Sequence, residues 1–581
     1  MKLIPNIAGY VFFCMQNHRA SKLFYIFGSY CSNVITMKYF TILLILFVLN
    51  ACSMKEKADL IVKNAVVYTV NDDMEIAGAF AVKDGKFLAV GPGDEITGRY
   101  DADEVLDAGG RTVYPGFIDA HCHFYGYGTN KLRYVDLAGT NSFEDVLSRV
   151  KAFAAENPEN SWILGRGWDQ NDWEQKEFPD RSELDKLFPD RAVLLIRIDG
   201  HAVLVNGKAL ELAGFDTSTK MPGGELLKKN GRLTGILLDN AADAVKNIVP
   251  SLNEKEREKA LLLAQKDCFS VGLTSVVDAG LDKEILETID RLDKSGELKM
   301  RIYAMVSANE ENIENYVKKG IYKTPYLHIA SVKLYADGAL GSRGACLLEP
   351  YSDDPGNYGF LVNSPEYLDS VCKIAFENGF QVNTHAIGDS AVRTVLNIYA
   401  KYLRPGNDRR WRIEHSQVVA PEDFSIYGKH NIIPAVNTTH ATSDMYWAEE
   451  RLGPERIKNA YAYKKLLEQN GWLTNGSDFP VESINPLYGF YAAVARKDRK
   501  GYPDGGFQPE NALTREEALK AMTIWAAKGS FEENEKGSIE AGKNADFVIT
   551  DRDIMKCDIA DVPDTKVVYT FSAGRKVFSE K

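Results

Sequence analysis

The chain has 581 residues, of which 45% are hydrophobic and 11% aromatic, and its formal charge at pH 7 is −12. This composition is ordinary for a large soluble globular protein, and α/β barrels of this length occur as single units. The acidic balance excludes nucleic-acid binding through phosphates, because the basic surface that such binding needs is missing.

A secretory signal is predicted near the N-terminus. Met37 and Lys38 precede an apolar stretch that is too short to span a bilayer, and small residues follow it. Residues 49–52 resemble a bacterial lipobox, which implies cleavage before Cys52 and lipidation of its thiol and amine. An uncleaved membrane anchor is the alternative. Residues 1–36 fit neither pattern, which leaves Met37 as a second candidate for the initiator.

Export would remove the signal and upstream segment, residues 1–51. This removal takes away four basic and no acidic residues, so the formal charge changes from −12 to −16. The cysteines after Cys52 are scattered and odd in number, which argues against a disulfide framework. We expect an exported lipoprotein of the cell envelope, anchored to a membrane only through its lipid and facing the periplasm or the cell surface.

Both ends of the mature chain have the pattern of short strands. After a polar tether at 53–58, residues 59–112 include a hairpin with its turn at Asp84-Gly85. Residues 531–581 contain short strands separated by glycine turns. Neither end has enough strands for a stable core, so we expect both to form one small β domain.

Residues 113–530 alternate between helical segments and short apolar runs. One predicted helix, TREEALKAMTIWAAKGSF, opens with a capping box from Thr514 to Glu517. The alternation predicts parallel strands joined by crossover helices. Several runs end in His, Asp or Lys, which is where barrel enzymes carry their chemistry. A doubly wound sheet competes, but no glycine-rich phosphate loop follows the first strand.

The segment YPGFIDAHCH contains two of the nine histidines, His121 and His123. Side chains alternate along a strand, so these two imidazoles share a face and Cys122 points away as a packing residue. Three later runs end in His385, His415 and Asp478. Neutral imidazole and carboxylate are ligands of zinc and similar ions, and packing alone does not explain this set.

Lys333 lies within another apolar run, SVKLYADG. A buried lysine is costly unless it is neutral or paired, and desolvation lowers the pKa of its amine. A neutral amine adds carbon dioxide to give a carbamate, which is an anion able to bridge two cations. The structural alternative is a salt bridge to Asp337 or Asp478.

The order of HxH, a strand-end lysine, two single histidines and a final aspartate resembles the amidohydrolase superfamily. Finer motifs resemble amidohydrolase family 3, which includes the N-substituted formamide deformylases. These motifs are GFIDAHCH, GRGWDQNDW, DGHAVLVN, VKLYADGALGSR, HAIGD, EHSQ, SDMYWAEERLGPER, GSDFPVE and GSIEAGKNADFVI. The likeness runs from about residue 60 to 579 and therefore covers nearly the whole mature chain.

The resemblance implies a distorted (β/α)8 TIM barrel with a small β-sandwich built from both chain ends. It implies one divalent metal, with zinc favoured, on His121, His123 and Asp478. A second ion would bind His385 and His415, with carboxylated Lys333 between the two ions. Mononuclear members of the family exist. Asn437 and Thr438 depart from the glutamine–proline pair that is usual in related sequences. The resemblance therefore does not predict which residues form the pocket wall after this strand.

The predicted reaction uses hydroxide, because a metal lowers the pKa of its bound water towards neutrality. Asp478 would take the proton and pass it to the leaving nitrogen, with a role as pure ligand as the alternative. His201 is a candidate oxyanion donor, and His440 a weaker candidate for the pocket wall. Arg166, Trp168 and Asp169 are candidates for substrate binding, with the fixing of a loop conformation as the alternative. His328 and His430 are assigned structural roles because each precedes a strand.

We expect a metal-dependent hydrolase of a non-peptide C–N bond in an amide, an N-substituted formamide or a cyclic amide. A lactonase or esterase with the same site is the first alternative. A lipid-anchored binding protein on an inactive scaffold is the second, although all six ligand positions are kept. The expected partner is a small-molecule substrate. The sequence leaves the substrate and the oligomeric state open, with a homodimer among the options.

Overall fold

The structure is a computed structural model that describes residues 55–580, so the predicted lipobox lies outside the described residues. The described residues divide into two units, one with residues 55–57 and 98–101 and one with residues 58–97 and 102–580. The barrel and the candidate site both belong to the second unit. Within residues 55–580 no helix is long and apolar enough to cross a membrane.

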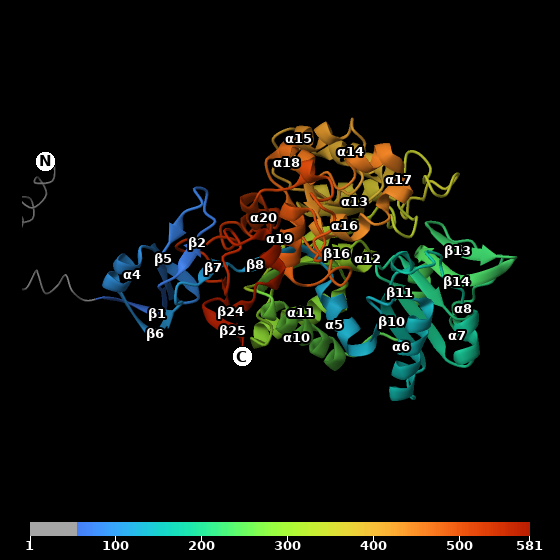
Figure 1. Ribbon diagram of the computed structural model, residues 1–581, viewed down its shortest axis with the longest axis horizontal. Coiled ribbons are helices and arrows are strands. Elements are labelled where there is room, and N and C mark those ends of the chain that lie inside the picture. Colours follow the sequence, from blue (N-terminus) through green and yellow to red (C-terminus); the bar gives the residue numbers. More distant parts are fainter. Residues whose placement is uncertain (1–54, 581) are drawn as a thin grey trace, which may run out of the picture. The chain divides into compact units, whose positions relative to one another are not determined.

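The second unit contains a nearly closed barrel of eight parallel strands, which confirms the predicted fold class (Figure 1). The strand order is β22-β21-β20-β19-β18-β16-β15-β8. Hydrogen bonds link the ends of the first and last strands, since His123 N donates to Phe479 O and Asp478 N donates to His121 O, both at 2.8 Å. The strands are β8 (Phe117–Cys122), β15 (Leu273–Leu281), β16 (Arg301–Ser307), β18 (Leu327–Tyr335), β19 (Gln381–Ala386), β20 (Arg412–His415), β21 (Ile433–Val436) and β22 (Thr474–Asn475).

The barrel strands are buried along almost their whole length, as expected for parallel strands covered on both faces. The helices include α5 (Phe124–Arg133), α10 (Glu254–Ser270), α11 (Lys283–Ser295), α13 (Pro365–Glu377), α14 (Asp389–Tyr402), α15 (Phe424–His430), α16 (Thr438–Asp444), α17 (Ala448–Arg456), α18 (Tyr463–Asn470) and α19 (Pro486–Ala495). The predicted capping box at Thr514 is present. The helix that it starts is interrupted at Thr523, whose backbone is non-helical, giving α20 (Arg515–Ala521) and α21 (Ile524–Gly529).

Two smaller sheets are built from the ends of the described chain, the first from N-terminal strands alone and the second from strands of both ends. One has the order β5-β4-β1-β6 and the other β25-β24-β23-β7-β2-β3. In Figure 1 the blue β7 lies beside the red C-terminal strands, because β23 pairs with β7. Phe80 and Phe547 bring the two sheets into contact, with ring centroids 4.9 Å apart. The strands are β1 (Glu56–Lys63), β2 (Val66–Tyr68), β3 (Ile76–Ala77), β4 (Ala79–Lys83), β5 (Lys86–Gly91), β6 (Tyr100–Asp107), β7 (Thr112–Pro115), β23 (Phe547–Thr550), β24 (Val567–Ser572) and β25 (Arg575–Ser579).

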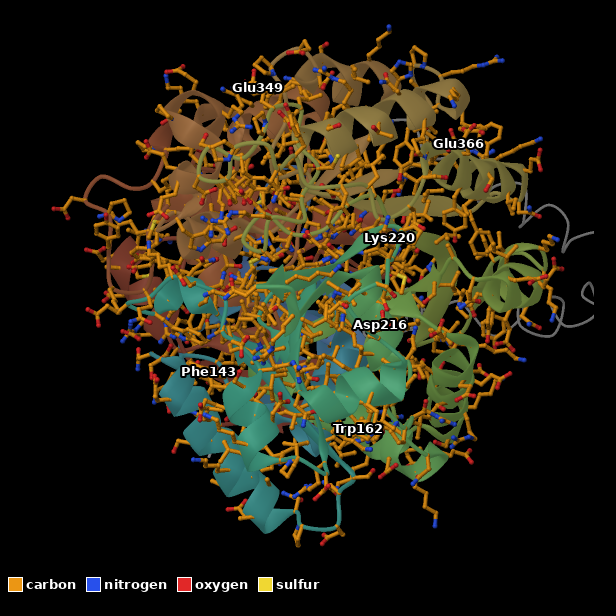
Figure 2. All side chains as sticks on the ribbon, turned by 90° about the vertical axis from the view of Figure 1, so that its right-hand side faces the viewer. Phe143, Trp162, Asp216, Lys220, Glu349 and Glu366 are labelled. Carbon is orange, nitrogen blue, oxygen red and sulfur yellow. The ribbon has the colours of Figure 1, made fainter. Side chains whose placement is uncertain are left out.

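The segment between α5 and α10 forms a separate sheet with parallel and antiparallel pairs, which we call the second sheet. Sequence analysis did not separate this sheet from the barrel. Its order is β13-β14-β12-β11-β10-β9. Figure 2 shows this part with Phe143 at the start of α6 and Trp162 at the start of β10. Its elements are β9 (Val135–Asp136), α6 (Phe143–Glu156), β10 (Trp162–Trp168), α7 (Ser182–Leu187), β11 (Ala192–Arg197), β12 (Ala202–Val205), α8 (Gly207–Ala213), β13 (Gly224–Lys229), β14 (Arg232–Asp239) and α9 (Asn240–Lys246).

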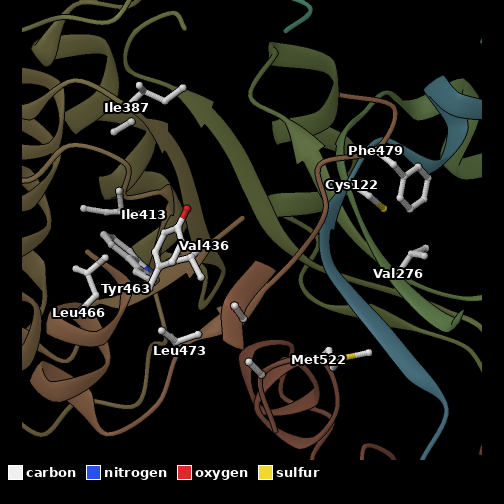
Figure 3. Packing of buried hydrophobic residues seen from close by; sticks show 14 of the residues in the cluster. Cys122, Val276, Ile387, Ile413, Val436, Tyr463, Leu466, Leu473, Phe479 and Met522 are labelled. Carbon is white, nitrogen blue, oxygen red and sulfur yellow. The ribbon is translucent and has the colours of Figure 1, made fainter. Parts of the chain in front are cut away.

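Cys122 lies in the main hydrophobic core rather than among the candidate ligands. Figure 3 shows it close to Phe479 and Val276, which belong to the same buried cluster. Its thiol points to Val277 O at 3.5 Å. Burial raises the pKa of the thiol well above its ordinary value, so it stays protonated. The cysteine between the two histidines is therefore a packing residue.

Candidate metal centre

The six predicted ligand positions lie at the carboxyl ends of the barrel strands. Four of them lie on four strands and two lie in the segments that follow β8 and β22, and the barrel brings them together although they are spread over more than half of the chain. They are His121 on β8, His123 directly after β8, Lys333 on β18, His385 on β19, His415 at the end of β20 and Asp478 after β22.

The tautomer of His121 is set by a buried carboxylate. Its Nδ1 donates a hydrogen bond to Glu414 Oε2, and Arg412 donates to both oxygens of that carboxylate at 2.7 and 2.8 Å. The nitrogen that donates to Glu414 must carry the proton. The other ring nitrogen, Nε2, therefore presents a lone pair, which is the form in which histidine binds a metal.

The same arrangement holds for His123 and His415. Nδ1 of His123 donates to Ala279 O at 3.1 Å, and Nδ1 of His415 donates to Asn437 Oδ1 at 2.9 Å. The Asn437 amide is itself oriented, since its Nδ2 donates to Gly476 O at 3.1 Å. Each of these imidazoles therefore also has Nε2 as its free lone pair.

These lone pairs converge on one carboxylate oxygen. Nε2 of His123 and Nε2 of His121 lie 3.3 and 3.7 Å from Asp478 Oδ1. That oxygen is buried and has no hydrogen-bond partner among the described residues. The donor atoms of His121, His415 and Asp478 all lie within 4.8 Å of one another. Acceptors facing one another in a buried site require a cation between them, so the residues fit a divalent metal with nitrogen and oxygen ligands.

Burial keeps the imidazoles of His121, His385 and His415 neutral at physiological pH. It lowers the pKa of His121 to about 4, with the charge of Lys333 acting in the same direction. The pKa of both His385 and His415 is also held well below the ordinary value, mainly by burial. Burial would raise the pKa of Asp478, but the surrounding histidines hold it well below its usual range. Neutral imidazoles beside an ionised carboxylate are the protonation states that metal binding needs.

Lys333 is almost completely buried, at 2% exposure. Its Nζ lies 3.3 Å from His121 Nε2, and among the described residues it forms no ion pair with a carboxylate. The alternative salt bridge to Asp337 or Asp478 is therefore not present. Burial lowers the pKa of this amine to about 8. The amine is thus neutral far more often than a solvent-exposed lysine.

The backbone is strained at two ligand positions. The φ angles of His415 and Asp478 are 71° and 61°, in the left-handed region that non-glycine residues rarely adopt. Each such residue costs on the order of 1–3 kcal/mol of folding free energy. Such backbone strain is typical of functional sites, where it fixes the direction in which a side chain points. His385 completes the set, with its ring 4.6 Å from that of His415.

Two cavities open onto this cluster, with volumes of about 190 and 420 Å³. We call them the small and the large cavity. Both are lined by Asp199, His201 and Val481. His440 and Asp169 line the small cavity, and Arg166 lines the large one. A substrate at the metal ligands can therefore extend in two directions.

The other predicted pocket residues differ in their environments. His201 stands 4.8 Å from the His385 ring, and its Nδ1 donates to Asp239 Oδ1 at 2.7 Å, so its Nε2 is free. His440 Nε2 is 3.8 Å from Asp478 Oδ2 and lacks a hydrogen bond. Trp168 is fully buried and donates to Leu195 O, so it packs the second sheet and lines neither cavity.

The remaining histidines of residues 55–580 lie outside the cluster. His328 pairs with Glu532 at 3.1 Å and His430 bonds to Leu403 O at 2.7 Å. Sequence analysis did not single out three of the partners that orient these histidines, namely Arg412, Glu414 and Asp239. It noted Asn437 only as a departure from related sequences and not as the partner of His415. The only available signal was RWRIEHS, in which two opposite charges stand two residues apart on a buried strand.

Comparisons with known proteins agree with this geometry. The model of the amidohydrolase family matches residues 104–578. The Bacillus subtilis protein YtcJ, which is named as an amidohydrolase, is 32% identical over 88% of this chain and 98% of its own. The N-substituted formamide deformylase of Arthrobacter pascens is 28% identical over 90% of this chain and 98% of its own. A crystal structure of an uncharacterized metal-dependent hydrolase from Pyrococcus horikoshii has a TM-score of 0.70 and 28% identity, covering 86% of this chain and 99% of that one.

Proposed function

Since the chain belongs to the amidohydrolase family, we propose that it hydrolyses a non-peptide C–N bond in an amide, an N-substituted formamide or a cyclic amide. One observation carries the proposal. The Nε2 lone pairs of His121 and His123 face the unpartnered Oδ1 of Asp478, and Lys333 Nζ is the only described hydrogen-bond partner of Nε2 of His121, an arrangement that suits a bound cation. The likeness to a formamide deformylase supports the choice of C–N over C–O bonds.

The metal set that we propose has two ions. His121, His123 and Asp478 would hold one, His385 and His415 the other, and Lys333 carboxylated on Nζ would bridge them. Zinc is the favoured ion, given the nitrogen and oxygen ligands. The ions would supply hydroxide at neutral pH and polarise the carbonyl of the substrate.

Side chains of the protein would accept and donate the protons of the reaction. Asp478 would accept a proton from the attacking water and deliver it to the leaving nitrogen, which leaves poorly unless it is protonated. His201 would donate from Nε2 to the carbonyl oxygen after protonation, with Asp239 holding its ring. Burial lowers the pKa of His201, but the hydrogen bond and charge of Asp239 outweigh this and raise it overall. His440 would face the same carboxylate from the small cavity.

A hydrolysis screen tests the proposal. The soluble form beginning at Ser53 would be loaded with zinc in bicarbonate and offered N-formyl amines, N-acyl amino acids, cyclic amides and lactones. We expect turnover of at least one amide class, together with one or two zinc ions per chain by elemental analysis. Turnover of lactones alone would replace the C–N assignment by ester hydrolysis. A chain that binds no metal would favour a binding protein on an inactive scaffold.

We also propose that the mature protein is a lipoprotein of the cell envelope, tethered through Cys52. The apolar stretch after Lys38 and the lipobox-like residues 49–52 support this proposal. Expression of the full chain in a bacterium should place it in the membrane fraction, with a mass that shows acylation. Cys52→Ala should abolish that mass increase. An unmodified Cys52 in the wild-type protein would contradict lipidation.

A further inference from the structure

The large cavity is lined by a guanidinium that forms no ion pair with any described carboxylate. The guanidinium of Arg166, at the end of β10, forms one hydrogen bond, from Nη2 to Ile198 O at 3.2 Å. Its Nε is buried without a partner. No carboxylate of the described residues lies within ion-pair distance of it, whereas Lys246, the other cation of this cavity, pairs with Asp243 at 2.9 Å.

Arg197 is a fully buried guanidinium whose charge is paired within the protein. It binds Asp169 and Asp199 and also Gln170, at 2.8 Å from its Nε. Burial would lower the pKa of Arg197, but the two carboxylates raise it. At Arg166 the effect of burial prevails and lowers the pKa. Asp478 and Asp199 act in the opposite direction without forming an ion pair with it. Arg166 is therefore a half-buried guanidinium with a buried, unpartnered Nε and no ion-pair partner among the described residues, an arrangement that an anionic ligand would stabilise.

The acidic groups of the large cavity already have partners of their own. Asp199 binds Arg197 at 2.6 Å and Asp239 binds His201 at 2.7 Å. Asp337 accepts three backbone N–H groups, from Cys346, Ile387 and Gly388, at 2.8 to 3.0 Å. None of these contacts uses Arg166, so its remaining donors are free to bind a ligand.

The space beside the guanidinium is kept open by a glycine. A Cβ at Gly200 would lie 3.4 and 3.5 Å from Nη1 and Nη2 of Arg166. The positive φ of 78° at Gly200 also disfavours any larger residue. The same cavity reaches His123 at the metal ligands. A molecule held by Arg166 would therefore extend to the reaction centre.

We propose that the substrate carries a carboxylate and that Arg166 binds it in the large cavity while the scissile amide lies at the metal ligands. This inference rests on the proposed function and narrows it to acylated or formylated amino acids and similar anionic amides. Guanidinium suits this task because its planar fork of donors matches the two oxygens of a carboxylate.

Binding tests the inference without turnover. The zinc-loaded protein would be titrated by calorimetry with phenylacetate and with neutral 2-phenylethanol. Arg166→Gln should weaken phenylacetate binding by roughly 10- to 100-fold, the usual value of a hydrogen bond to a charged group. The affinity for 2-phenylethanol should not change. Arg166→Lys keeps the charge and should retain part of the affinity, and Arg232→Gln, at an exposed position, should change neither value.

Two binding results would overturn the inference. Phenylacetate binding that is equal in wild type and Arg166→Gln would show that the carboxylate is held elsewhere, for example by the metal. Absence of phenylacetate binding by the wild type would show that Arg166 only balances the acidic groups of the site. Circular dichroism and thermal unfolding of each variant would establish that loss of binding is not loss of fold.

Kinetics separate this inference from the proposed function. N-formylphenylalanine and N-formylphenethylamine differ only in the carboxylate. Wild type should prefer the former, and Arg166→Gln should remove the preference through a higher KM while leaving the neutral amide unaffected. Turnover of both compounds with no effect of Arg166→Gln would keep the hydrolase and overturn the carboxylate inference. Arg166-dependent phenylacetate binding with no turnover of any amide would keep the carboxylate inference and overturn the proposed amide hydrolysis.

Discussion

Asp478→Asn is expected to lower kcat by roughly 10³-fold, within the range that general acid–base catalysis contributes. Asparagine keeps the shape of the side chain and one oxygen near Nε2 of His121 and His123, so metal content should persist. It removes the carboxylate that would accept and deliver the proton. The measurement is kcat and KM on a substrate found in the screen, with zinc per chain determined on the same sample.

A matched control for this variant is Asp190→Asn, at an exposed position between α7 and β11. It should leave both kcat and metal content unchanged. Retained turnover in Asp478→Asn would assign the proton transfer to another group, with His201 and His440 as the candidates. Loss of turnover together with loss of zinc would show that Asp478 acts chiefly as a ligand.

The candidate ligand positions could be predicted from the sequence because histidine and aspartate occur at or just after the ends of apolar runs. His385 and His415 each end a short apolar run, and the carboxyl ends of parallel strands meet on one side of a barrel. The alternation of side chains also explained Cys122, which packs in the core between two ligand histidines. These inferences need only the period of a strand and the order of the runs.

The partners of the ligands could not be found in this way. Glu414 is next to His415 in the chain, yet it serves His121 on a strand almost 300 residues away. This pairing depends on barrel closure, which sequence spacing does not describe. The positive φ of His415 adds to the difficulty, because it turns the histidine away from the position that simple alternation would give.

The second sheet was missed for a related reason. Its strands are short apolar runs separated by helices, which is also the pattern of the barrel. The distinguishing feature is antiparallel pairing, as between β11 and β12, and it shows only in the folded chain. Arg166, His201 and Asp239 lie on this sheet or directly beside its strands and line the large cavity. These pocket residues therefore belong to a structural element separate from the barrel.

Lys333→Ala is expected to abolish the bridging group between the proposed ions. Loss of even an outer partner of a metal ligand weakens metal affinity about 10- to 100-fold, so loss of a bridging ligand should cost at least that much. Zinc content and turnover should fall together. Lys229→Ala, at an exposed position on β13, should change neither. Acetate added to Lys333→Ala should restore part of the activity, because its carboxylate can occupy the space of the carbamate.

The carbamate itself gives a direct signal. Wild type incubated with ¹³C-bicarbonate and zinc should show a carbamate carbon resonance that is absent in Lys333→Ala. Burial lowers the pKa of Lys333 to about 8, which makes the neutral amine roughly 300-fold more populated at pH 7 than in an ordinary lysine. Only the neutral amine reacts with carbon dioxide. Reactivation of protein depleted of bicarbonate and metal should therefore rise from pH 6 and level off above pH 8. Full zinc binding and turnover without any carbamate signal would show that Lys333 acts as a free amine and that the two-ion site needs no bridge from it.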